Sequence, residues 1–225
     1  MSGPGIVIFD FDGVILESAD IKTRAFARLF ESHAEHVQAI VDLHLELAGV
    51  SRFEKFRLIY RDILDLPLDE AEMERLGTEF SGIALEEILR CPFVPGAREF
   101  LKARHESHAL YVASGTPEEE LRGIVRDRDL ARYFRGVYGT PALKADISLR
   151  ILEERSAEPS EAVFVGDAMT DLEGARGAGV PFVGRVAPGD PDPFASEDVP
   201  VVADLRELAL EWPRICAELH SRSAA

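Results

Sequence analysis

Five short, uninterrupted runs of apolar residues lie along the chain of 225 residues. Runs of this kind are typical of parallel β-strands covered on both faces, because such strands have no polar side. Helical patterns separate several of the runs, and this alternation predicts an α/β fold with a doubly wound parallel sheet. The expected strands are Ile6–Phe9, Ala109–Ala113, Ala162–Val165, Pro181–Val183 and Val199–Val202, and the expected helices include Glu118–Arg126, Ala145–Arg155, Thr170–Ala178 and Leu205–Leu219.

The segment from residue 10 to residue 108 interrupts this alternation. A crossover between parallel strands needs only about a dozen residues, so most of the segment must form something else. Apolar residues return in it with a helical period from about Ala19 to Leu89. We therefore expect a Rossmann-like catalytic core formed by residues 1–16 and 93–225, and an inserted α-helical cap domain formed by residues 17–92. An insertion at this point lies over the carboxyl ends of the strands, where open α/β sheets bind ligands.

The charge of the chain argues against several classes of partner. Asp and Glu number 41, Lys and Arg number 25, and the formal net charge is −16. Such a chain repels nucleic-acid phosphates and anionic lipids, so we expect neither a nucleic-acid nor a membrane partner. Two cysteines are too few for a disulfide framework, and the N-terminus has no leader pattern. We expect a cytoplasmic protein that is a monomer or a weak homodimer, with a frayed tail after Trp212.

Polar side chains follow the apolar runs at the points where parallel strands would end, and one lysine precedes a helical pattern between them. These residues are Asp10, Asp12, Ser114, Lys144, Asp167 and Asp171. Because neighbouring parallel strands end at the same edge of a sheet, we expect the six side chains to converge. Carboxylates that are packed together repel each other unless a cation neutralises them. Oxygen ligands with room for a phosphate favour Mg²⁺ as that cation.

Four motifs in this order resemble the haloacid dehalogenase superfamily, in the branch with a helical cap that includes phosphoglycolate phosphatases and β-phosphoglucomutases. The motifs are Asp10-Phe11-Asp12-Gly13-Val14, Ser114-Gly115-Thr116, Lys144, and Gly166-Asp167 through Asp171. The resemblance implies a Mg²⁺-dependent phosphatase, a phosphoric monoester hydrolase that acts on a small phosphorylated metabolite through an aspartyl-phosphate.

The resemblance also implies a role for each motif residue. Asp10 would be the nucleophile, and Asp12 would protonate the leaving oxygen and later activate water. Ser114 and the N–H of Gly115 would bind phosphoryl oxygens, and Lys144 would neutralise charge on the phosphate and on Asp10. These roles suit phosphoryl transfer, which depends mainly on positioning and on charge stabilisation.

For the metal, the resemblance implies a Mg²⁺ site formed by Asp10, Asp12 through its backbone carbonyl, and Asp167. Asp171 would be a further ligand or would hold the ligands in place. Outside the resemblance, Asp171 could cap the helix that follows it, and Ser114 could cap the helix after Pro117.

Asp12 argues against two other reactions in the superfamily, because dehalogenases usually have an aromatic residue at this position and phosphonoacetaldehyde hydrolases a small one. A sugar-phosphate mutase of the β-phosphoglucomutase type remains the alternative. An ungapped comparison places Lys22 where such mutases tend to have a histidine, which favours the phosphatase. A regulatory protein that only keeps the fold is the non-enzymatic alternative.

Two cations in the expected cap, Arg52 and Lys55, lie three residues apart on one helical face. The segment around them resembles the substrate-specificity loop of this branch, so both are predicted to bind substrate. Arg52 suits a second phosphate or a carboxylate at the non-reacting end of the substrate. The alternative is a solvated helix start in which Arg52 pairs with Glu54 or another acidic neighbour.

Overall fold

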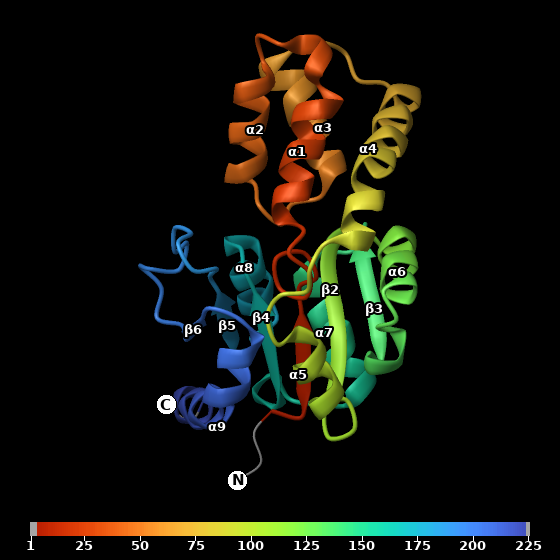
Figure 1. Cartoon of the computed structure of the whole chain (residues 1–225). Helices are drawn as coiled ribbons and strands as arrows, with labels where there is room; N and C mark the ends of the chain where they lie inside the picture. The colour runs from red at the N-terminus through yellow and green to blue at the C-terminus, as the bar shows by residue number, and fades with distance from the viewer. Residues whose placement is uncertain (1–3, 224–225) are drawn as a thin grey trace. The chain divides into compact units, whose positions relative to one another are not determined.

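The computed structural model describes residues 4–223, with side chains described through Leu219, and the chain divides into two compact units (Figure 1). The first unit, here called the core, consists of Met1–Glu17 and Pro92–Ala225. The second, here called the helical unit, is Ser18–Cys91. The borders expected from the sequence, at 16/17 and 92/93, each lie one residue from these.

A parallel sheet of six strands forms the centre of the core, in the order β3-β2-β1-β4-β5-β6. The strands are β1 (Ile6–Phe9), β2 (Ala109–Pro117), β3 (Gly136–Thr140), β4 (Ala162–Gly166), β5 (Phe182–Arg185) and β6 (Val201–Val202). The predicted α/β class with a helical insertion between the first two strands is confirmed. The strand order reverses between β1 and β4, and open sheets bind ligands at such a point.

Helices cover both faces of the sheet. On one face, α7 (Lys144–Arg155) and α8 (Met169–Gly177) pack in a cluster that contains Ile6 and Ile8 of β1. On the other face, the ring of Phe9 meets Phe100 of α5 (Ala97–Arg104), which meets Trp212 of α9 (Leu205–Ser223). The apolar residues of β1 are therefore divided between two buried layers, which explains why the strand has no polar side.

Apart from shifts of one or two residues at the ends of other elements, the structure differs from the sequence-based elements in four places. It adds β3 and α5, which the sequence did not indicate, and it extends β2 past Ala113 to Pro117. The predicted frayed tail after Trp212 is wrong, because α9 continues to Ser223. The part of that prediction that concerns residues 224–225 lies outside the described residues. The remaining core helix, α6 (Glu118–Asp127), connects β2 with β3, and short 3₁₀ turns lie at Ala131–Tyr133 and Pro159–Glu161.

The helical unit contains α1 (Ala19–Leu29), α2 (Val37–Glu46), α3 (Arg52–Leu58) and α4 (Glu70–Arg90), with a 3₁₀ turn at Glu31–His33 and a π-turn at Ile59–Ile63. Its interior is aromatic. The ring of Phe26 lies 4.8 Å from that of Phe80 and 5.7 Å from that of Phe56, all three buried. Aromatic rings bury large apolar areas, so the unit has a hydrophobic core of its own. Within residues 4–223, no helix is long and apolar enough to cross a membrane.

The two linker segments of the core, before and after the insertion, pair with each other. Leu16 forms an antiparallel bridge with Phe93, and the N–H of Glu17 donates to the carbonyl of Pro92 over 3.0 Å. The N–H of Val94 donates to the carbonyl of Ile15 over 3.1 Å. The chain therefore leaves the core and returns to it at neighbouring positions.

Candidate active site

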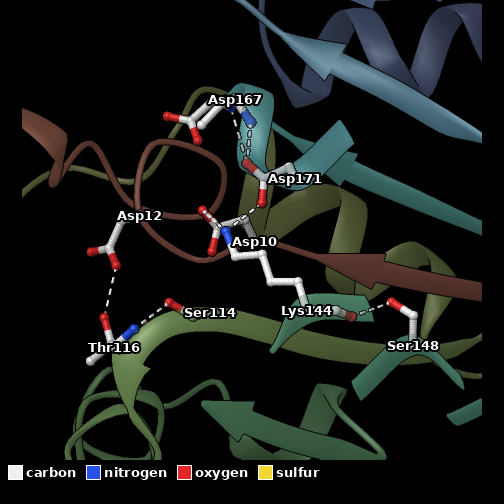
Figure 2. Close-up of polar contacts among 9 residues, drawn as sticks. Asp10, Asp12, Ser114, Thr116, Lys144, Ser148, Asp167 and Asp171 are labelled. Carbon is white, nitrogen blue, oxygen red and sulfur yellow. Dashed lines mark hydrogen bonds and ion pairs between the residues drawn. The ribbon is translucent and has the colours of Figure 1, made fainter. Parts of the chain in front are cut away.

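Asp10 lies immediately after β1, at the carboxyl end of the sheet (Figure 2). Its N–H donates to the carbonyl of Val165 in β4 over 2.9 Å, which fixes the backbone of Asp10 against the neighbouring strand. The side chain is buried, and its Oδ2 lies 3.3 Å from Nζ of Lys144. Among the described residues, Oδ1 has no hydrogen-bond partner. Buried polar atoms nearly always have a partner, so this oxygen is available to a ligand or a reactant.

Lys144, the first residue of α7, places its ammonium between two carboxylates (Figure 2). It pairs with Oδ2 of Asp10 and with Oδ1 of Asp171, which lies in the first turn of α8. The Oδ2 of Asp171 accepts from the backbone N–H groups of Asp167 and Ala168, over 3.1 and 3.0 Å. Both oxygens of Asp171 are thus engaged, so Asp171 orients Lys144 and also holds the N–H groups at the start of α8.

Asp167 follows β4 and packs against the loop after β1. A Cβ at Gly13 would overlap the Asp167 carboxylate, and Gly13 has a φ of +74°, which favours glycine. Three carboxylate oxygens, one each from Asp10, Asp167 and Asp171, lie within 4.8 Å of one another. Three carboxylates this close form an acidic cluster of the kind that could hold a metal ion.

The end of β2 brings two further motif residues into the site. The Oγ of the buried Ser114 accepts from the N–H of Thr116 over 3.2 Å. The hydroxyl of Thr116 donates to Oδ2 of Asp12 over 3.0 Å (Figure 2). Pro117 is the N-cap of α6, and within the described part of the chain no side-chain hydrogen bond caps that helix end. The alternative in which Ser114 caps this helix is therefore wrong. The Ser114 hydroxyl lies near the carboxyl end of β2.

Burial and mutual repulsion shift the pKa values of the charged groups in the acidic cluster. Burial raises the pKa of Asp10 to about 7, with Asp171 and Asp12 adding to the rise and Lys144 opposing it. Burial, followed by repulsion from Asp10 and Asp171, raises the pKa of Asp167. Burial would lower the pKa of Lys144, but attraction to Asp10 and Asp171 outweighs it and raises that pKa. One lysine thus does not balance the cluster, and the unpartnered Oδ1 of Asp10 fits a further cation.

The two predicted substrate contacts lie inside the helical unit. Arg52 is buried, its guanidinium donates to Oγ of Ser81 over 2.8 Å, and it lies over the ring of Phe80 at 4.6 Å. The alternative of a solvated Arg52 is wrong, because the side chain is buried, and Glu54 pairs with Arg57. Lys55 is buried as well. Substrate binding by Arg52 and Lys55 stays a prediction.

Sequence reasoning missed Arg185, at the end of β5. Its buried guanidinium donates to the carbonyl of Gly13 over 3.0 Å and to the carboxylate of Glu17 over 2.7 and 3.2 Å. It also donates to the carbonyl of Ala203 over 3.1 Å. Arg185 thus holds the loop that carries Asp12. The only signal in the sequence is a charged residue that ends an apolar run, which is too common to use alone.

Comparisons with known proteins agree with this geometry. Residues 5–179 match the model of the haloacid dehalogenase-like hydrolase family. The chain is 28% identical over 179 residues to a phosphorylated carbohydrates phosphatase from Thermotoga maritima, covering 77% of this chain and 81% of the relative. It is 25% identical over 183 residues to phosphoglycolate phosphatase 1 from Pseudomonas aeruginosa, covering 79% and 67%.

A solved structure extends the comparison to the fold. The crystal structure of a hydrolase from Pseudomonas syringae superposes with a TM-score of 0.78 at 18% sequence identity, and the match covers 94% of this chain and 99% of that one.

Proposed function

The chain belongs to the haloacid dehalogenase-like hydrolase family and is a phosphoric monoester hydrolase, and from this premise we propose that it releases phosphate from a small phosphorylated metabolite through an aspartyl-phosphate at Asp10. The observation that carries the proposal is the Asp10 carboxylate. It is buried, it contacts one cation, and one of its oxygens has no hydrogen-bond partner among the described residues. A carboxylate in this state suits a nucleophile that works beside a metal ion.

In the first step, a carboxylate oxygen of Asp10 forms a bond to phosphorus, and the bond from phosphorus to the ester oxygen breaks. Asp12 supplies the proton that the departing oxygen needs. The Ser114 hydroxyl and the Gly115 N–H bind phosphoryl oxygens, and the Lys144 ammonium offsets their negative charge. Donors that are already oriented stabilise the transition state without having to reorganise.

In the second step, Asp12 accepts a proton from water while the water oxygen forms a bond to phosphorus. The bond from Asp10 to phosphorus then breaks, which releases inorganic phosphate and restores the carboxylate. One side chain thus acts as the acid first and as the base afterwards.

We assign Mg²⁺ to the carboxylates of Asp10 and Asp167 and the backbone carbonyl of Asp12. When bound, the ion would supply positive charge to the phosphoryl oxygens. Asp171, whose two oxygens already have partners, would orient Lys144 and the Asp167 backbone instead of binding the ion directly.

For the substrate class, we infer a phosphorylated carbohydrate or a phosphorylated small acid, as the names of the relatives suggest. Arg52 and Lys55 of the helical unit remain our candidates for contacts with its non-reacting end. A panel of sugar phosphates, phosphoglycolate and nucleoside monophosphates would rank the candidates by kcat/KM.

The test is phosphate release from 4-nitrophenyl phosphate with and without Mg²⁺. We expect metal-dependent release from the wild type and a loss of about 10³-fold or more in kcat for Asp10→Asn. Incubation of the wild type with substrate and rapid acid quench should leave phosphate covalently attached at Asp10. Phosphate release also separates hydrolysis from transfer to a second position on a sugar.

The matched control is Asp146→Asn, an exposed aspartate in the first turn of α7. It makes the same chemical change near Lys144 without touching the site, so kcat should stay within about twofold. Equal activity of Asp10→Asn and the wild type would refute the proposal.

A further inference from the structure

We propose that Thr116 is a positioning residue for Asp12, and that its hydroxyl holds the Asp12 carboxyl group in the orientation from which it transfers the proton. The inference deepens the proposed function, because it rests on Asp12 acting as the acid and base. Its basis is the hydrogen bond of 3.0 Å from the Thr116 hydroxyl to Oδ2 of Asp12. Thr116 itself is buried at the end of β2.

The backbone at this point is irregular in a way that aims the side chains. The pairing of β2 with β3 is regular through Ala113 and resumes at Pro117, opposite Thr140, with a shift of register between the two. Irregularities of this kind turn side chains out of the strand alternation and occur often beside active sites. Here the shift contains Ser114 and Thr116.

The neighbouring strand, β3, packs against the backbone of Thr116. Gly139 of β3 lies so close to the carbonyl of Thr116 that a Cβ on Gly139 would overlap it. Replacement of Gly139 by any larger residue would therefore push the Thr116 backbone away. The position of the hydroxyl is set by backbone packing as well as by its own hydrogen bond.

Thr116 connects two groups that the reaction uses in the same step. Its N–H donates to Oγ of Ser114 over 3.2 Å, which leaves the Ser114 hydroxyl proton to donate elsewhere. Its own hydroxyl donates to Asp12. A single residue thus sets the orientation of the phosphate donor and of the acid.

The hydrogen bond holds the Asp12 carboxyl group in one orientation. Because the Thr116 hydroxyl donates to Oδ2, rotation of the carboxyl group about its bond to Cβ would break the hydrogen bond. An acid that is held in place delivers its proton along a defined direction, and the same orientation serves when Asp12 accepts a proton from water in the second step.

The experiment compares kcat/KM for two phosphate esters, an alkyl phosphate and 4-nitrophenyl phosphate. The kcat/KM value reports the steps through the first irreversible one, in which an alkoxide needs the proton and 4-nitrophenolate scarcely needs it. We expect Thr116→Val to lower kcat/KM about 10-fold for the alkyl phosphate and less than threefold for the aryl phosphate. Thr116→Ser, which keeps the hydroxyl, should restore both values to within about threefold of the wild type.

The chain offers a matched control in Thr140, which lies opposite Pro117 on β3. Its buried Oγ1 has no hydrogen-bond partner in the described part of the chain. Thr140→Val makes the same exchange of hydroxyl for methyl at the same carboxyl end of the sheet. We expect both kcat/KM values to stay within about twofold of the wild type. A loss in Thr140→Val equal to that in Thr116→Val would assign the effect to packing and overturn the inference.

Asp12→Asn, measured with the same two esters, separates the inference from the function it rests on. A selective loss for the alkyl ester in Asp12→Asn, together with an equal loss for both esters or no loss in Thr116→Val, would overturn the role of Thr116 and leave the function intact. No phosphate release by the wild type from either ester would overturn the proposed function, and the inference would fall with it.

Discussion

Two buried lysines, one in each unit of the chain, have neighbours of opposite kinds. In the core, Lys144 contacts the carboxylates of Asp10 and Asp171. In the helical unit, Lys55 donates to Nδ1 of His44 over 2.9 Å and to the His44 carbonyl over 3.1 Å. Burial, followed by repulsion from Lys55 and Lys22, lowers the pKa of His44 to about 3, so the ring is neutral at ordinary pH.

The difference shows two ways in which a protein stabilises a buried ammonium. Lys144 depends on opposite charge, and it fixes the geometry of groups that we expect to react. Lys55 donates to a neutral ring, and burial and the charge of Lys55 itself oppose protonation of that ring. A change that removes charge should therefore affect the core strongly and the helical unit weakly, and a change of pH should act on the two units in opposite directions.

The largest effect is expected when each of the two buried lysines is replaced, in turn, by methionine. Lys144→Met should lower kcat by about 10³-fold and, without metal at pH 8, the free energy of unfolding by about 3 kcal/mol, because two buried carboxylates lose their cation. Lys55→Met removes hydrogen bonds to a neutral partner and should lower that free energy by about 1 kcal/mol. Steady-state kinetics and urea unfolding measure both. Equal losses of stability in the two variants would contradict the comparison.

The second effect separates the two aspartates that follow β4. Asp171→Asn loses the ion pair with Lys144, although its amide oxygen can still accept the two backbone hydrogen bonds. We expect kcat to fall about 10²-fold with little change in Mg²⁺ affinity. Asp167→Asn should instead weaken Mg²⁺ binding about 10- to 100-fold. Calorimetric titration with Mg²⁺ provides a measurement that does not depend on turnover. Similar losses of affinity in both variants would make Asp171 a ligand.

The third effect is the pH dependence of stability without metal. The pKa of Asp10 rises from 3.8 to about 7 on folding, so the folded core binds a proton that the unfolded chain releases, and its contribution to stability falls between about pH 4 and 7. The pKa of His44 falls from 6.5 to about 3, so its contribution rises with pH between about 3 and 6.5. Each pKa changes by about three units, so each contribution should reach about 4 kcal/mol.

Thermal unfolding in a chelating buffer checks both signs. Relative to Asp10→Asn, the wild type should lose several degrees in Tm as pH rises from 4 to 7. Relative to His44→Gln, it should gain several degrees as pH rises from 3 to 6.5. If the plots of Tm against pH for the wild type and for one of the variants ran parallel, the pKa of the replaced residue would not change on folding as the structure indicates.

The smallest effect concerns the buried arginine of the helical unit. If Arg52 binds the non-reacting end of the substrate, Arg52→Ala should raise KM about 10-fold and leave kcat within threefold. Because Arg52 also packs on Phe80 and donates to Ser81, the control is Ser81→Ala, which removes this hydrogen-bond acceptor and keeps the guanidinium. An unchanged KM in Arg52→Ala would end the assignment of Arg52 to substrate.

The parts of the fold that could be predicted are those in which local chemistry is decisive. The strand β1 is apolar throughout because it is buried on both faces, and Asp10 is the first polar residue at its end. By contrast, β3 is half-exposed at the sheet edge, and two of its residues, Gly136 and Gly139, have no side chain to form an apolar pattern. Only its pairing with β2 makes it a strand.

The details of the site depend on contacts between distant parts of the chain. The hydrogen bond from Thr116 to Asp12 joins the end of β2 to the loop after β1, and Thr116 lies in the shift of register between β2 and β3. The burial of Arg52 and Lys55 could not be predicted from the sequence either, because charged residues are usually exposed. These two are buried by the aromatic packing around α3.

The pairing of Leu16 with Phe93 has a consequence for how chains of this kind can change. Paired antiparallel strands lie about 5 Å apart, so the two ends of the insertion are close enough for a short turn to join them. A segment of any length whose own ends meet at that spacing could replace residues 18–91 without moving β1 or β2. The insertion is therefore an exchangeable part. Evolution or design can lengthen, shorten or replace it while the carboxylates that follow β1 and β4 stay in register.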